Sequence, residues 1–133
     1  MNRQLADALV IFFLATALVF ASLDAKAELC PAPDFDSWDK ALGATATLAT
    51  LSDWRQTQVI AKHPTQWREL NPVLGEHPTI GQVNRHFLWN GLLMSGVAYC
   101  LPSTWRKGYL VAVTAVEVSF ARHNYNLGIR FGF

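Results

Sequence analysis

The sequence has few charged residues and almost no net charge. Charged side chains make up 16% of the 133 residues, and 11 Lys and Arg balance 10 Asp and Glu to a net charge of +1. Average soluble domains carry about 25% charged residues. Without a basic surplus the chain offers no field that would recruit nucleic acid, so we expect no nucleic-acid partner. The 51% of hydrophobic residues favours a lipid bilayer as the partner instead.

Motifs for catalysis and for cofactors are also lacking. The chain has no glycine-rich phosphate loop, no G-x-S-x-G turn and no cysteine nucleophile with a candidate base beside it. Its four histidines fall in no dense ligand pattern such as H-E-x-x-H, and two of them, His63 and His77, precede a proline in a loop. We therefore expect no catalytic residue, no metal site and no cofactor, which favours a non-enzymatic protein.

Only two cysteines occur, Cys30 and Cys100, which is too few for a structural zinc site. They form a disulfide if both face an oxidising compartment. The alternative is two free thiols that pack as small apolar groups. The sequence leaves both interpretations open.

The first 27 residues look like a targeting or anchoring segment. An uncharged apolar run from Ala8 to Leu23 precedes the small pair Ala25-x-Ala27, which a signal peptidase can cut before Glu28. A cleaved signal peptide and a first membrane helix both fit this pattern. In either case residues 28–133 form a single helical membrane domain.

Three further helices are expected, over residues 41–61, 83–101 and 105–121. Asp36 or Ser37 caps the first, and Thr79 with Gln82 forms a capping box at the start of the second. Pro102 separates the last two, which form a helical hairpin. Because 83–101 and 105–121 have spanning length, the pattern predicts an all-α transmembrane bundle of three to four helices.

The two hairpin helices carry stripes of small residues at three- and four-residue spacing. Such stripes let helices approach closely in lipid. They predict packing within the hairpin, and packing of the protein with itself, as a homo-oligomer, or with another membrane protein. The stripe residues are Gly91, Ser95 and Ala98 on the first helix and Gly108, Ala112, Ala115 and Ser119 on the second.

The distribution of charge predicts an orientation in the bacterial inner membrane. With the amino terminus inside, the acidic 28–40 loop lies on the periplasmic side and the loop with Lys62, Arg68 and Arg85 lies in the cytoplasm, as the positive-inside rule requires. Arg106 and Lys107 depart from this rule, because they fall in the short outer turn. This multi-pass topology places both cysteines toward the same oxidising side.

The carboxyl end has strand periodicity. Apolar and aromatic residues alternate through 123–133, which predicts a short extended tail after the last helix. A membrane barrel needs at least about eight such strands, and residues 41–101 show no alternating series. Partial β-structure stays as an alternative to the all-α interpretation.

A few polar residues carry the functional hypotheses. Asp53, Gln56 and Thr57 share one helical face, and a charge buried in lipid requires a partner or a purpose. One hypothesis pairs Asp53 with Arg55, Arg85 or the backbone amides of the Asn71-Pro72 loop. The other is a proton or ion path through Asp53, His86 and Glu117. The candidate binding residues are Asp53, Gln56, Thr57, Asn71, His77, His86 and Glu117.

A pair of short motifs resembles a known group of proteins. Asp53-Trp54-x-Gln56-Thr57, followed by Asn71-Pro72-x-Leu74-Gly75-x-His77-Pro78, is similar to small uncharacterised bacterial and phage multi-pass membrane proteins over roughly residues 48–101. The resemblance implies a multi-pass helical architecture and no mechanism. We expect a small integral membrane protein that acts through helix packing, with a small transporter or channel-like component using intramembrane acids as the alternative.

Overall fold

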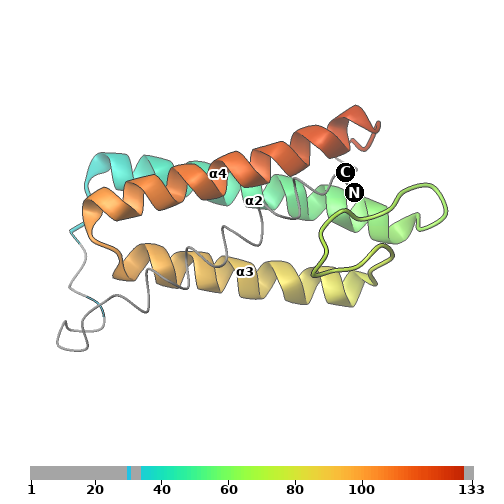
Figure 1. The fold of residues 1–133 in the computed structure, drawn as a ribbon, viewed down its shortest axis with the longest axis horizontal. Coiled ribbons are helices and arrows are strands. Elements are labelled where there is room, and N and C mark those ends of the chain that lie inside the picture. The colour runs from blue at the N-terminus through green and yellow to red at the C-terminus, as the bar shows by residue number, and fades with distance from the viewer. Residues whose placement is uncertain (1–29, 31–33, 131–133) are drawn as a thin grey trace.

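The computed structural model describes Cys30 and residues 34–130, which contain three helices (Figure 1): α2 (Ser37–Lys62), α3 (Ile80–Cys100) and α4 (Ser103–Asn126). No strand occurs among these residues, so the all-α prediction is confirmed and the β alternative is wrong for this part of the chain. The segment 1–27, predicted to be a signal peptide or an anchor, lies outside the described residues.

The helices form a bundle in which α2 is the central element. Figure 1 shows α2 and α4 running side by side in the same direction, with α3 antiparallel below them. α2 contacts α4 most extensively and α3 to a lesser degree, whereas α3 and α4 touch at few points. The predicted close packing within the α3–α4 hairpin is therefore wrong. The reason is the rotation of α4, which turns Leu110 and Val113 toward the core and leaves Gly108 and Ala115 exposed.

Local sequence signals set the helix starts. Asp36 accepts a hydrogen bond from the Asp39 amide at 2.8 Å, and the Asp39 carboxylate accepts one in return from the Asp36 amide. Thr79 and Gln82 make the same reciprocal pair at α3. Both predicted caps are confirmed, because a capping box satisfies amides that the first helical turn leaves unpaired.

The end of α4 differs from the predicted tail. Residues 123–126 continue the helix, and the chain leaves it at Gly128, whose φ of 87° lies in the left-handed region that favours glycine. The prediction of an extended tail from residue 123 is therefore wrong as far as Asn126. Asn124 explains the difference, because its side chain is buried on the inner face of α4 and bonds to α2.

An apolar core lies in the middle of the bundle, and polar groups are buried next to it along α2. Ala46 of α2 packs with Met94 and Ala98 of α3 and with Leu110 and Val113 of α4. Farther along α2 the buried positions change to Thr50, Asp53, Gln56 and Thr57. Small residues in the first half let the helices approach, and this approach encloses the polar groups of the second half.

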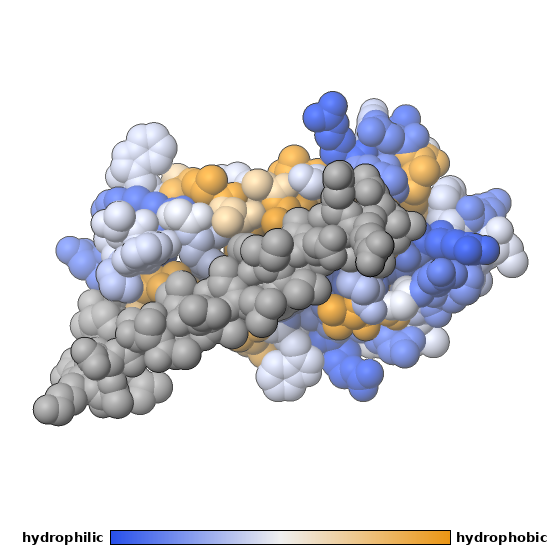
Figure 2. All heavy atoms as spheres, in the orientation of Figure 1, coloured by the Kyte–Doolittle hydropathy of each residue, from blue (hydrophilic) through white to orange (hydrophobic). Residues whose placement is uncertain are grey.

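The outer surface carries many hydrophobic side chains. Figure 2 shows them on the visible faces of the helices, with hydrophilic residues concentrated toward the end that carries the 63–79 loop. The large exposed apolar residues include Leu48 and Leu51 of α2, Leu88 and Leu92 of α3, and Val111 and Val118 of α4. The predicted transmembrane spans at 83–101 and 105–121 are nevertheless unsupported: within residues 34–130, no helix combines the length and the apolarity that a bilayer crossing requires.

Candidate functional site: a buried cluster of acids and amides

The inner face of α2 is polar over its second half. Asp53, Gln56 and Thr57 are 7%, 1% and 1% exposed, and Thr50 precedes them on the same face. Three- and four-residue spacing on a helix aligns these positions on one side. The three residues that the sequence grouped together thus all point into the bundle.

The other two helices supply the partners of this face. Asn124 of α4 donates a hydrogen bond through Nδ2 to Oδ1 of Asp53 at 3.1 Å. Glu117 lies two turns earlier on α4, and its Oε1 accepts a hydrogen bond from Nδ2 of Asn90 on α3 at 3.2 Å. Together with Thr50, which is within hydrogen-bonding reach of Glu117, these residues form what we call the acid–amide cluster: Thr50, Asp53, Asn90, Glu117 and Asn124.

Burial changes the acidity of both carboxyl groups. Desolvation raises the pKa of Asp53 from 3.8 to about 8, and the nearby negative charges of Glu117 and Glu69 add to the rise. Desolvation also raises the pKa of Glu117, against the opposing effect of the hydrogen bonds from Asn90 and Thr50. Neither acid forms a salt bridge with any residue of the described chain. At neutral pH Asp53 therefore retains its proton.

Two buried oxygens beside the cluster lack hydrogen-bond partners. Gln56 donates through Nε2 to the Ile129 carbonyl at 3.4 Å, and its Oε1 has no partner. Glu69 accepts the amides of Leu70 and Asn71 on Oε1, while its Oε2 is also unpaired. The interior beside the cluster thus has two acceptors that no donor satisfies.

The partner predicted for Asp53 differs from the observed one. Arg55 bonds to Gln58 at 3.0 Å on the outside of α2, and Arg85 is exposed on α3. Neither guanidinium, nor any backbone amide of the loop that contains Asn71 and Pro72, bonds to Asp53, so that hypothesis is wrong. Asn124 takes this role instead, and it was missed because it was assigned to an extended tail. Its spacing of seven residues from Glu117 was the signal for a shared face.

The remaining candidates lie in and near the 63–79 loop. Asn71 is half-buried, and its Nδ2 contacts Nε2 of His86 at 3.2 Å, which ties the loop to α3. Burial lowers the pKa of His86, so the ring is neutral at pH 7 and Nε2 accepts this hydrogen bond. His77 is exposed and makes no hydrogen bond or ion pair with the described residues, so the structure gives it no part in the cluster.

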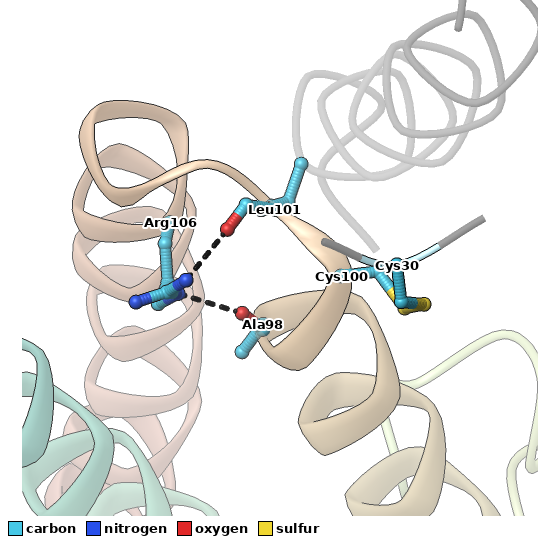
Figure 3. Close-up of a disulfide and its surroundings, with 5 residues drawn as sticks. All are labelled: Cys30, Ala98, Cys100, Leu101 and Arg106. Atoms are coloured by element: carbon cyan, nitrogen blue, oxygen red, sulfur yellow. Dashed lines mark hydrogen bonds between the residues drawn. A yellow bond between two sulfur atoms is a disulfide. The ribbon is translucent and has the colours of Figure 1, made fainter. Parts of the chain in front are cut away.

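A second buried charged group lies at the opposite end of the bundle. Arg106, which the sequence placed in an exposed turn, is 3% exposed and pairs with Oδ2 of Asp39 at 2.8 Å. It also donates to the carbonyls of Asp34, Ala98 and Leu101, the latter two shown in Figure 3. We call this group the arginine clamp. Asp39 precedes Asp53 by two heptads, which was the available signal for a shared buried face.

A disulfide lies beside the arginine clamp. Cys30 and Cys100 are bonded at the carboxyl end of α3, on the side of that helix end away from Arg106 (Figure 3). Phe35 packs under the Arg106 guanidinium, 4.2 Å from ring centroid to Cζ, and also contacts the ring of Tyr99. These contacts fix the start of α2 to the junction of α3 and α4.

The chemistry available to the acid–amide cluster is proton binding. Two carboxyl groups with raised pKa values face neutral amides and a hydroxyl, and within residues 34–130 no three His, Cys, Asp or Glu side chains gather as metal ligands do. The cluster contains no activated nucleophile. Comparison of the chain with protein-family models, curated proteins and solved structures gave no match.

Proposed function

We propose that the protein is a non-enzymatic inner-membrane component that acts by packing the outer face of α4 against a second copy of itself. The observation that supports this proposal is where the polar and apolar side chains lie in the bundle. Acids and amides are buried beside the apolar core, while exposed leucines and valines lie on the outer faces of the three helices. Exposed apolar side chains gain nothing from contact with water, whereas lipid favours apolar outer faces.

The outer face of α4 has the pattern of a helix-packing seam. Gly108, Val111, Ala115 and Val118 are all exposed and follow one another at alternating three- and four-residue spacing. This is the a/d pattern by which helices interdigitate. A methyl group added at Gly108 would meet no atom within 4 Å, so the fold of a single copy does not require glycine at this position. The small residues thus remain available for a neighbouring helix.

The disulfide supports the proposed location. Disulfides persist in oxidising compartments such as the periplasm and are rare in the cytosol. The Cys30–Cys100 bond therefore supports a periplasmic position for Cys30 and for the end of α3. The proposed topology had placed both of these on that side of the inner membrane.

Cysteine crosslinking in isolated membranes tests the self-association. Both native cysteines are bonded, so a single new cysteine gives an unambiguous result. We expect the V118C variant to form a disulfide-linked dimer, while the Q66C variant, with its cysteine in the exposed 63–79 loop, stays monomeric. A single monomeric species for V118C, in membranes and in detergent, would overturn the proposal.

A matched pair of glycine substitutions separates association from folding. Gly108 on α4 and Gly96 on α3 are both exposed, and an added Cβ meets nothing within 4 Å at either. Leucine favours helix over glycine by roughly 0.5–1 kcal/mol, so neither change harms the fold. We expect Gly108→Leu to abolish the dimer and Gly96→Leu to leave it intact. Equal behaviour of the two variants would exclude the α4 seam.

A second candidate function is favoured by the acid–amide cluster: proton-coupled transport that uses Asp53 and Glu117 as proton carriers. A carboxyl group with a pKa of about 8 exchanges its proton near neutral pH. In proteoliposomes, Asp53→Asn abolishes proton flux on this hypothesis while the variant still folds. Unchanged flux, or no flux in the wild type, would remove it.

A further inference from the structure

A hollow on the side of α3 was assigned no role by the sequence. It has a volume of about 400 Å³ and lies between α3 and the turn of the 63–79 loop. Val73 and Leu74 of the loop form one wall, and Trp89 and Leu93 of α3 form the other. This volume is within the range of small-molecule sites, which are typically about 300–1,000 Å³.

The loop wall is held in place by specific bonds. The side-chain oxygen of Asn71 accepts a hydrogen bond from the Val73 amide at 3.0 Å. The backbone carbonyl of Asn71 accepts hydrogen bonds from the Leu74 and Gly75 amides, each at 3.1 Å. Gly75 has a φ of 76°, which a residue with a side chain rarely adopts. The Asn71–His86 contact then joins this turn to α3. These bonds therefore hold the hollow open as a part of the fold.

One cation borders this apolar hollow. Arg85 is exposed at its edge and makes no hydrogen bond or ion pair with the described residues. No acid lines the hollow, and His86 in its wall is neutral at pH 7. The lining thus combines a single unpaired guanidinium with a mostly apolar surface, and a guanidinium binds phosphate or carboxylate through two parallel hydrogen bonds.

We infer that this hollow binds an anionic phospholipid, with the phosphate at Arg85 and part of one acyl chain between the loop wall and Trp89. Arginine and tryptophan both suit the boundary between headgroups and acyl chains. This inference rests on the membrane residence proposed above. A free fatty acid offers the same combination of anion and chain, and the experiment below distinguishes the two sources.

Fluorescence quenching by brominated lipids in neutral detergent micelles tests the site. Bromine on an acyl chain quenches a tryptophan that it contacts, and Trp89 is 64% exposed. We expect brominated phosphatidylglycerol to quench at about tenfold lower concentration than brominated phosphatidylcholine, which corresponds to one charge-assisted contact. The Trp89→Phe variant should lose this selective quenching and keep the background from the other tryptophans.

Two arginine variants provide the controls. Arg85→Gln removes the phosphate contact and should equalise the two lipids, whereas Arg122→Gln, which removes an exposed charge from α4, should keep the preference. Equal quenching by both lipids in the wild type, or equal loss in both variants, would overturn the inference. Brominated oleate quenching Trp89 more strongly than brominated phosphatidylglycerol would overturn the phospholipid assignment.

Because the hollow lies on α3 and the 63–79 loop whereas the seam lies on α4, this assay does not depend on dimerisation. Failure of the α4 crosslinks with intact lipid selectivity would refute the proposed function alone. Intact crosslinks with no lipid selectivity would refute only the lipid site.

Discussion

The two ends of the bundle bury carboxylates in opposite ways. In the arginine clamp, Asp39 meets a guanidinium at 2.8 Å, and three carbonyls accept hydrogen bonds from three of its other four N–H groups. In the acid–amide cluster, Asp53 and Glu117 meet only amides and a hydroxyl. The first arrangement pairs its carboxylate with a cation, while in the second, burial raises the pKa of both carboxyl groups and Asp53 retains its proton at neutral pH. The clamp therefore fixes structure, and the cluster is the part of the core that responds to pH.

The largest expected effect of a single substitution comes from breaking the clamp. Arg106→Met leaves Asp39 buried without its cation, and loss of one partner of a buried pair costs about 3–5 kcal/mol. The free energy of unfolding in urea, measured in mild detergent, checks this. Lys107→Met is the matched control, because Lys107 pairs with Asp36 at the exposed edge of the same end and should change stability little. An equal loss of unfolding free energy in the two variants would contradict the difference between the buried and the exposed ion pair.

Removal of the disulfide is expected to weaken the same end by a smaller amount. Replacing Cys30 and Cys100 together by serine opens a link between positions 70 residues apart, which typically costs about 2–4 kcal/mol. Thermal unfolding of the double variant and of the reduced wild type should agree. Because the clamp also holds the Asp34 carbonyl, this end should stay folded at room temperature. Loss of all helical signal at 25 °C would show that the clamp does not hold this end without the disulfide.

The acid–amide cluster should give the stability a pH dependence. Between pH 4 and pH 8 folded Asp53 retains a proton that the unfolded chain has released, so rising pH destabilises the fold across this window. The expected slope is about 1.4 kcal/mol per pH unit for one proton, and the effect levels off above pH 8. Unfolding free energies from pH 5 to pH 9 measure it.

Asp53→Asn sharpens the contrast between the two ends. Asparagine keeps an oxygen to accept the Asn124 hydrogen bond and cannot ionise, so the slope should fall to the part contributed by Glu117. The Arg106→Met variant should keep the wild-type slope at lower overall stability. Identical slopes in Asp53→Asn and the wild type would mean that Asp53 does not hold the proton.

Several elements could be predicted because they depend on neighbours in the sequence. The capping boxes at Asp36 and Thr79 and the shared face of Asp53, Gln56 and Thr57 follow from spacings of three and four residues. The Asn90–Glu117 contact joins different helices, so no spacing within one helix could predict it. The burial of Arg106 had no local signal, because a turn position and a core position look alike in sequence.

By itself the sequence determined that this chain forms helices, where α2 and α3 begin, and which face of α2 is polar. Only the tertiary structure decided that α4 packs on α2 rather than on α3, and that Asn124 and Arg106 complete the two buried sites. The physical reason is that spacing fixes a side chain's direction around its own helix axis. The partner it meets depends on how whole helices rotate and cross, which the packing of all inner faces settles together.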